Sequence, residues 1–198
     1  MSAGSLQIWA ETRAHTPASK GVQRHVDSGN AMLPAMPSDP DLLVQSLGLR
    51  PHPEGGFYAE TFRSDLPVEA HGSTRPASTA IYFLLRLADF SAFHRVRSDE
   101  VWHHYAGDAL ELLLLRADGA LERLRLGSDV TQGERPQAVA RRDVLQAARV
   151  LPGGKHGFSL CGCTVAPGFE FADFELPERS ALQSRFPEHA PLFDTFCR

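Results

Sequence analysis

The segment that most constrains the fold is 93–107, where two stretches with strand-like alternation of side chains meet at a short turn. Before the turn, His94 and Val96 lie two residues apart, so an extended strand places them on one face. The same period places three later residues on one face: Glu100, Trp102 and His104. The Ser-Asp pair at 98–99 separates the halves, because short polar side chains favour a change of direction. If the two strands are neighbours, two imidazoles, a carboxylate and an indole point into one space.

Strand signals continue along most of the chain after residue 56. The strongest is the Asp-Gly turn at 118–119 between two apolar runs, 110–115 and 121–126, which predicts a hairpin. Further strands are expected over residues 57–63, 78–86, 137–139, 144–149, 157–164 and 170–174. Short strands at this spacing are typical of sandwiches and barrels, so we predict a mainly β fold with one or two short helices.

The chain is long enough for one well-filled domain, with 198 residues of which 42% are hydrophobic. Residues 1–38 show neither helical nor strand periodicity, and we predict a disordered tail there. The predicted single domain spans 39–198. It begins with a helix capped by Asp39 or Ser38, with Pro40 at its first position. A final helical turn is expected over 180–186.

Charge and cysteine content exclude several classes of protein. The net charge of −4 comes from 20 basic and 24 acidic residues without a basic stripe, which argues against binding of nucleic acid or anionic membranes. The three cysteines have no Cys-x-x-Cys spacing, so no disulfide framework or zinc knuckle is indicated. No run approaches the about 18 apolar residues of a membrane helix. We therefore expect a cytoplasmic protein.

The spacing of His94, Glu100 and Gly107 resembles the first cupin motif, in which Val96 here replaces the second histidine. Runs at 53–58, 79–82, 98–102 and 163–171 extend the similarity to small RmlC-type cupins, the fifth cupin family, whose function is unknown. The resemblance covers about residues 40–176. It implies a jelly-roll barrel, also called a double-stranded β-helix, that commonly forms a homodimer and holds a small-molecule ligand in its mouth.

The second cupin motif falls on residues 141–146, where Gln146 replaces the histidine. Only His94 and Glu100 remain at the four usual ligand positions, so we expect no cofactor. A metal-dependent enzyme is an alternative. It requires His94, Glu100 and either His104 or Gln146 to converge within about 2.0–2.2 Å of one point, the usual distances from a metal to nitrogen or oxygen.

Without a metal, the same residues favour acid–base chemistry. A carboxylate from Glu100 or Asp99 beside His94 would fix the tautomer of the imidazole and raise its basicity. RmlC is a metal-free sugar epimerase with a histidine base, and resemblance at fold level implies an isomerase or epimerase for a sugar or nucleotide-sugar. The alternative is a non-catalytic binding or sensing module. Candidate ligand contacts are Glu54, Gly56, Thr79, Tyr82, Trp102, His104, Gln146 and Phe169.

Overall fold

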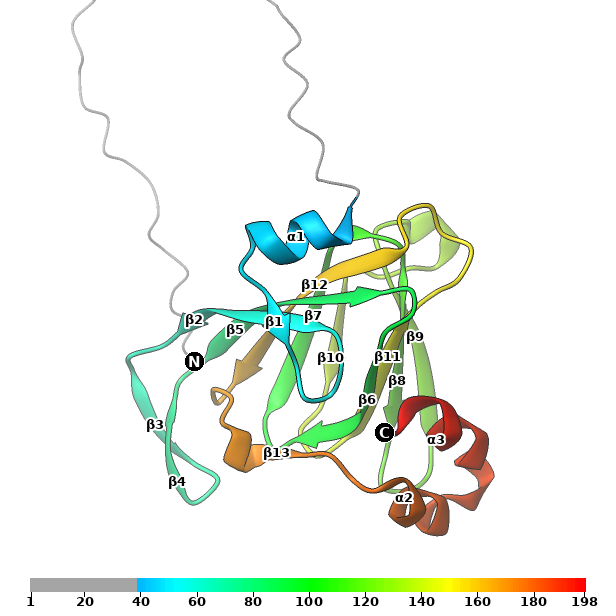
Figure 1. Cartoon of the computed structure of the whole chain (residues 1–198). Coiled ribbons are helices and arrows are strands. Elements are labelled where there is room, and N and C mark those ends of the chain that lie inside the picture. Colours follow the sequence, from blue (N-terminus) through cyan, green and yellow to red (C-terminus); the bar gives the residue numbers. More distant parts are fainter. Residues whose placement is uncertain (1–38) are drawn as a thin grey trace, which may run out of the picture. The chain divides into compact units, whose positions relative to one another are not determined.

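The strands of this computed structural model, which describes residues 39–198, form two antiparallel sheets that face each other (Figure 1). One sheet has the order β1 (Arg50–Pro51), β2 (Phe57–Arg63), β5 (Thr79–Arg86), β12 (Phe158–Ala166), β7 (Asp99–Gly107) and β10 (Gln137–Ala140). The other has the order β13 (Phe174–Glu175), β6 (Phe90–Val96), β11 (Leu145–Val150), β8 (Leu110–Leu115) and β9 (Leu121–Leu126). The predicted tail at 1–38 lies outside the described residues.

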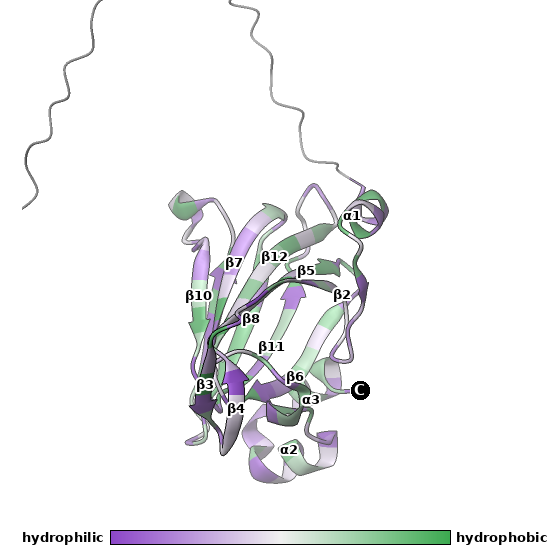
Figure 2. Ribbon diagram, turned by 90° about the vertical axis from the view of Figure 1, so that its left-hand side faces the viewer, coloured by the Kyte–Doolittle hydropathy of each residue, from purple (hydrophilic) through white to green (hydrophobic). Residues whose placement is uncertain are grey.

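Short elements lie around the two sheets. The hairpin β3 (Pro67–Ala70) and β4 (Ser73–Pro76) forms a separate two-stranded sheet. The helices are α1 (Pro40–Ser46), α2 (Arg179–Arg185) and α3 (Ala190–Phe196), with single 3₁₀ turns η1 (Val130–Gln132), η2 (Phe171–Asp173) and η3 (Pro187–His189). Figure 2 shows α1 at one end of the molecule and α2 and α3 at the other. Within residues 39–198, none of the helices has the length and apolar character of a membrane span.

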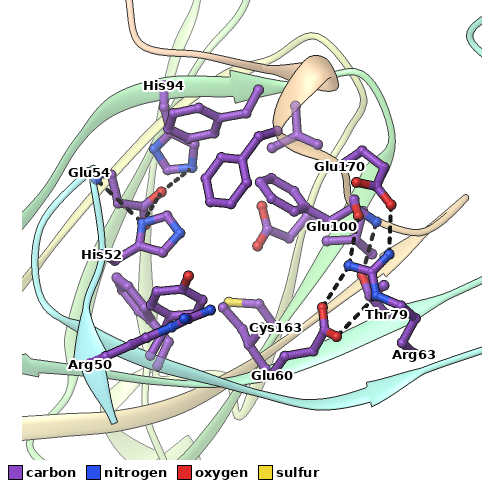
Figure 3. A pocket seen from close by; sticks show the side chains of 18 residues that line it. Arg50, His52, Glu54, Glu60, Arg63, Thr79, His94, Glu100, Cys163 and Glu170 are labelled. Carbon is purple, nitrogen blue, oxygen red and sulfur yellow. Dashed lines mark hydrogen bonds and ion pairs between the residues drawn. The ribbon is translucent and has the colours of Figure 1, made fainter.

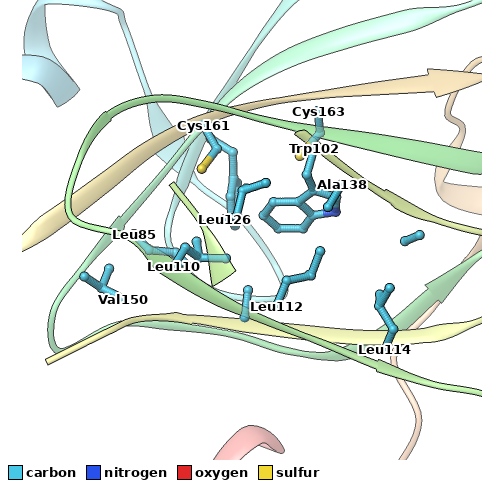
Figure 4. Close-up of a cluster of buried hydrophobic side chains, with 13 residues drawn as sticks. Leu85, Trp102, Leu110, Leu112, Leu114, Leu126, Ala138, Val150, Cys161 and Cys163 are labelled. Atoms are coloured by element: carbon cyan, nitrogen blue, oxygen red, sulfur yellow. The ribbon is translucent and has the colours of Figure 1, made fainter. Parts of the chain in front are cut away.

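The main hydrophobic core fills the space between the two sheets (Figure 4). Phe83 and Trp102 from the six-stranded sheet meet edge to face, with ring centroids 5.6 Å apart. The opposing sheet contributes Leu110, Leu112 and Leu114 of β8. These three residues alternate along the strand, as the period of two requires when one face is buried.

The other face of β8 is buried as well, which explains its nearly continuous run of leucines. Leu113 and Leu115 point away from the barrel and contact α2 and α3 through Leu182, Phe193 and Phe196. On the outside of the six-stranded sheet, α1 covers part of β5 and β12 in the same way. Each buried methylene contributes about 0.8 kcal/mol, so the helices stabilise both sheets from outside.

Most elements expected from the sequence are present. The hairpin around Gly119 is confirmed, with Leu115 opposite Leu121 and Leu110 opposite Leu126. The first helix is confirmed with Asp39 as its cap. The strand expected over 170–174 is largely wrong: residues 171–173 form η2, because the buried Asp173 turns inward and pairs with Arg75 at 2.6 Å.

The two halves of residues 93–107 belong to opposite sheets. β6 ends at Val96 and lies in the five-stranded sheet, whereas β7 begins at Asp99 in the six-stranded sheet. The two strands are therefore not neighbours within one sheet. Because the turn carries the chain across one end of the barrel, His94 and Glu100 both line the same interior space.

Candidate functional site

A cavity of about 260 Å³ opens between the sheets, at the end of the barrel where β6 passes into β7 (Figure 3). Buried polar groups lie in its interior, and aromatic and charged groups surround its mouth. It is lined by Arg50, His52, Glu54, Tyr58, Glu60, Arg63, Thr79, Ile81, Phe83, His94, Val96, Glu100, Cys163, Val165, Phe169, Glu170, Phe171 and Phe174.

The loop that joins β1 to β2 inserts Glu54 into this cavity. Its course depends on Gly55, whose φ of 121° is unsuited to other residues and at which a Cβ atom would collide with the carbonyl oxygen of Phe90. The loop is held to β6 by a hydrogen bond in which the backbone N–H of Ala92 donates to the carbonyl of Glu54, at 2.9 Å. The carboxyl group is thereby placed next to two imidazoles.

Glu54 lies between His94 and His52. Its Oε2 is 3.2 Å from Nε2 of His94 and 3.4 Å from Nδ1 of His52, while its Oε1 accepts a hydrogen bond of 2.9 Å from Ser91. Nδ1 of His94 bonds to the carbonyl of Ala92 at 2.8 Å. A carbonyl only accepts, so this nitrogen carries a hydrogen and leaves Nε2 free to face Glu54.

Burial moves the pKa values of these groups toward their neutral forms. It raises the pKa of Glu54 to about 8, against the opposing effect of the hydrogen bond from Ser91. Burial, with a smaller effect from His94 and Arg50, lowers the pKa of His52 to about 4. It also lowers the pKa of His94. At neutral pH the proton between Glu54 and His94 therefore resides on the carboxyl group.

Glu100 reaches into the cavity across from Glu54 and the two imidazoles (Figure 3). Its Oε2 accepts a hydrogen bond of 2.5 Å from Nε2 of Gln146, whose Oε1 accepts one of 2.9 Å from the Trp102 indole. Burial raises the pKa of Glu100. The thiol of Cys163 lines the cavity beside it, and burial holds the pKa of this thiol well above its usual value. The cavity thus has a second buried carboxyl group on its other side.

The mouth of the cavity combines aromatic rings with two arginines. Phe169 and Phe171 meet edge to face at 5.1 Å. Arg63 is neutralised by two carboxylates, at 2.8 Å from Glu60 and 2.7 Å from Glu170. Arg50 instead lies over the Tyr58 ring at 4.9 Å, and no acid among residues 39–198 pairs with it. One cation at the mouth is therefore available to a ligand.

The structure brings five of the predicted site residues to the cavity: Glu54, Thr79, His94, Glu100 and Phe169. Asp99, the first residue of β7, is not among them, because its side chain lies outside the barrel. There its carboxylate accepts hydrogen bonds from Arg141 at 2.9 Å and from the backbone N–H of Arg142 at 2.8 Å. It therefore cannot orient His94, and Glu54 is the carboxyl group that does so.

The remaining predicted contacts lie outside the cavity lining. Trp102 is in the core and Gln146 lies behind Glu100. Tyr82 contacts Tyr105. Gly56 forms part of the turn before β2, and Nε2 of His104 bonds to the carbonyl of Asp108 beyond the far end of β7.

Several lining residues were not predicted from the sequence, among them His52, Tyr58 and Arg50. One available signal was the position of His52 two residues before Glu54 in a short loop with two glycines. That spacing permits a histidine and a carboxyl to enter one cavity, but only if the loop turns inward, which depends on contacts with β6.

The residues at the cupin metal positions do not fit a metal ion. Val96 offers no donor atom, and both polar atoms of the Gln146 amide are bonded to Glu100 and Trp102. Nε2 of His94 is directed at Glu54, and His104 lies far away along β7. Within residues 39–198, no three His, Cys, Asp or Glu side chains are grouped as metal ligands.

Comparison with known proteins supports the fold. Residues 41–177 match the family described as Cupin superfamily (DUF985). An uncharacterized protein of Saccharomyces cerevisiae, YML079W, is 32% identical over 155 residues, which cover 71% of this chain and 76% of the yeast protein.

Two solved structures are similar over most of their length. A hypothetical protein from Leishmania major is 33% identical, with a TM-score of 0.76 over 79% of this chain and 97% of that chain. Protein SO0799 from Shewanella oneidensis is 37% identical, with a TM-score of 0.74 over 80% of this chain and 96% of that chain. The mainly β architecture and these similarities lead to one conclusion: the chain belongs to the DUF985 family of the cupin superfamily, with the double-stranded β-helix fold.

Proposed function

We propose that the cavity binds a small, polar, sugar-like metabolite and transfers a proton on it, so that the protein is an isomerase or epimerase. One observation supports this most: Glu54 and His94 form a buried pair on the wall of an open cavity, with 3.2 Å between Oε2 and Nε2. A carboxyl and an imidazole with displaced pKa values are the groups that general acid–base catalysis uses at neutral pH.

The pair supplies the base of the proposed reaction. Nδ1 of His94 is held by the carbonyl of Ala92, so the ring accepts a proton at Nε2. Glu54, protonated at neutral pH, holds that nitrogen in place and keeps the pair uncharged when no ligand is bound. A neutral pair is the form that a water-poor cavity stabilises.

Glu100 supplies the acid on the other side. Gln146 bonds to its Oε2, which leaves Oε1 for a ligand. In the proposed epimerisation, the carboxyl proton of Glu54 passes to Nε2 of His94, and the Glu54 carboxylate so formed takes the proton of a C–H bond beside a carbonyl group, whose electron pair forms an enolate. Glu100 then donates a proton to the opposite face of that carbon, and exchange with solvent returns the proton from His94 to Glu100.

The size and mouth of the cavity suit a molecule of monosaccharide size. Its volume of about 260 Å³ is below the roughly 300–1,000 Å³ of sites for drug-sized ligands. The aromatic rings of Phe169 and Phe171 provide apolar surface for the ring of a sugar. Arg50 provides a cation for a carboxylate or another anionic substituent.

Exchange of hydrogen for deuterium tests this proposal directly. The full chain is incubated in D₂O with a panel of aldoses, ketoses and sugar acids, and loss of individual C–H signals is followed by proton NMR. We expect exchange at one carbon of at least one compound, slowed by about 10²–10⁴-fold in His94→Gln. The matched control is His103→Gln, at an imidazole outside the cavity that bonds to Thr164.

A result without exchange would favour the binding module instead. If a compound raises the Tm of the protein, and His94→Gln abolishes this shift, but no C–H signal exchanges, the cavity binds without catalysis. If no compound of the panel shifts the Tm or exchanges, the sugar-like ligand class is wrong.

The homodimer also stays a prediction. Tyr105 is 53% exposed and Val139 is 41% exposed, and Val139 alternates with the buried Ala138 and Ala140, so it points away from the barrel. We propose that a second copy of the chain covers this outer face of the six-stranded sheet. Light scattering after size exclusion is expected to give twice the chain mass, and Tyr105→Glu to give the monomer. A monomeric wild-type protein would contradict the proposal.

A further inference from the structure

A second hollow, of about 730 Å³, lies beside the cavity on the outside of the β6–β7 turn. The two spaces share a wall, because residues at the two ends of this turn face the cavity and the residues between them face the hollow. Val96 and Glu100 line the cavity, whereas Ser98 and Asp99 line the hollow. The tip of the β3–β4 hairpin closes one side of it, through His71.

The hollow carries an excess of positive charge in a chain whose net charge is −4. Three guanidinium groups line it, from Arg97, Arg141 and Arg142, against one carboxylate, that of Asp99. Both oxygens of Asp99 are occupied, Oδ2 by Arg141 at 2.9 Å and Oδ1 by the backbone N–H of Arg142 at 2.8 Å. These bonds, the one from the backbone first, hold the pKa of Asp99 below its usual value, so it stays ionised.

The two other guanidinium groups have no matched acid. The closest carboxylate to Arg97 is that of Asp173, at 3.8 Å, but Arg75 already binds both oxygens of Asp173, at 2.6 and 3.0 Å. The side chain of Arg142 forms no ion pair with any acid within residues 39–198. The hollow therefore has two cations whose charge is not balanced within the described part of the chain.

Hydrogen-bonding groups accompany these charges. Ser98 is only 3% exposed, and its hydroxyl lies 2.9 Å from Nε2 of His71. The His71 backbone has a φ of 57°, a conformation uncommon outside glycine, and its carbonyl accepts a hydrogen bond of 3.4 Å from Arg97. The hairpin tip and the β6–β7 turn are thus joined, and they hold a hydroxyl and an imidazole beside the arginines.

We propose that this hollow is a binding site for the phosphate group of a small phosphorylated molecule, separate from the proton-transfer cavity. Guanidinium groups bind phosphate oxygens through two parallel hydrogen bonds, and a dianion matches the two unbalanced arginines. Because the Ser98 hydroxyl and the His71 imidazole are hydrogen-bonded to each other, this pair provides one further donor when the imidazole is neutral. A groove for nucleic acid would need a longer basic stripe than three arginines provide.

Titration with pyrophosphate and inorganic phosphate tests the site. Binding to the full chain is measured by calorimetry at low ionic strength, with Arg97→Gln, Arg142→Gln and the double variant. We expect saturable binding of pyrophosphate, weakened about threefold or more by each single change, since the arginines are partly exposed. Arg116→Gln, at an exposed arginine of the β8–β9 turn paired with Asp118, is the matched control and is expected to bind as the wild type does.

Two further arms separate this site from the cavity and from a membrane. Glu54→Gln, which alters only the cavity, is expected to leave pyrophosphate binding unchanged. Failure of sugar exchange would therefore not affect this proposal. No saturable binding, equal binding by the double variant, or loss of binding in Glu54→Gln would overturn it. Binding to vesicles with phosphatidic acid but not to pyrophosphate would assign the hollow to a lipid surface and also overturn it.

Discussion

Glu54 and Asp108 are both buried carboxyl groups, 5% and 8% exposed, but their oxygen atoms have different partners. Asp108 follows β7 and accepts four hydrogen bonds from three backbone N–H groups, those of Lys155, His156 and Gly157, at 2.7–3.0 Å. Glu54 accepts one hydrogen bond from a hydroxyl and otherwise contacts two imidazoles beside a cavity.

The difference indicates what each group does. Backbone N–H groups only donate and cannot move a proton to a ligand, so Asp108 is suited to fix the loop over 151–157. An imidazole both donates and accepts, so Glu54 can exchange a proton with His94. Burial alone is therefore a poor guide to function, and the partners of a buried carboxyl are a better one.

Replacement of Glu54 is expected to have the largest effect on activity, without a loss of stability. Glu54→Gln keeps the size of the side chain and its hydrogen-bonding capacity but cannot release a proton. We expect deuterium exchange to slow by about 10²–10⁴-fold, with no loss in the free energy of unfolding at neutral pH, because glutamine stays neutral without binding a proton. NMR exchange and urea denaturation measure the two effects. A large loss of stability with normal exchange would reverse the roles assigned to Glu54 and Asp108.

Replacement of Asp108 is expected to do the opposite. Asp108→Ala leaves three backbone N–H groups of one loop without their acceptor, and we expect a loss of about 2–3 kcal/mol in the free energy of unfolding. Exchange at a temperature where the protein is folded should stay within about twofold. Asp118→Ala, at an exposed carboxylate of the β8–β9 turn, is the control and should leave the free energy of unfolding close to that of the wild type.

The sequence predicts the strands better than the site. Alternation and the Asp-Gly turn identify the β8–β9 hairpin because both signals are local. The period of two also correctly groups Glu100 with Trp102 and His104, but it carries no information about depth. Each pair of residues advances about 6.8 Å along a strand, so His104 lies about 14 Å along β7 from Glu100.

The carboxyl partner of His94 could not be assigned from spacing. Asp99 and Glu100 are adjacent, so only one of them points inward, and the choice depends on which face the opposite sheet covers. Glu54 is 40 positions from His94 in the sequence, and it reaches His94 because Gly55, which lacks a Cβ atom, packs against the carbonyl group of Phe90. Such contacts form only in the folded chain, which explains why the role of Glu54 as partner emerged from the structure.

The dependence of stability on pH tests the state of Glu54. A carboxyl with a folded pKa of about 8 binds a proton that the unfolded chain releases near 4.5, so stability falls as pH rises between these values. His52, lowered to about 4 from 6.5, changes stability only below 6.5, where stability rises with pH. Between pH 6.5 and 8 we therefore expect the free energy of unfolding to fall, by on the order of 1–2 kcal/mol.

Glu54→Gln removes this contribution, and denaturant titrations at several pH values are expected to show a flatter profile between 6.5 and 8. Some slope should remain because burial also raises the pKa of Glu100. Glu175→Gln, at an exposed carboxylate paired with Arg95, is the matched control and should retain the wild-type slope. An unchanged slope in Glu54→Gln would mean that Glu54 is ionised at neutral pH.

The smallest expected effect comes from replacing an aromatic residue at the mouth of the cavity. Phe171 is 54% exposed and stacks near His52 at 6.5 Å, so Phe171→Ala admits water to the cavity without creating a void in the core. Water stabilises the ionised carboxyl, and we expect the pKa of Glu54 to fall by less than about one unit. Carbon NMR of labelled glutamate measures it, with Glu54→Gln to assign the signal. Phe62→Ala, at a 53% exposed ring outside the cavity, should leave it unchanged. If neither variant changes the pKa of Glu54, the interior groups of the cavity alone raise this pKa above that of an ordinary carboxyl group.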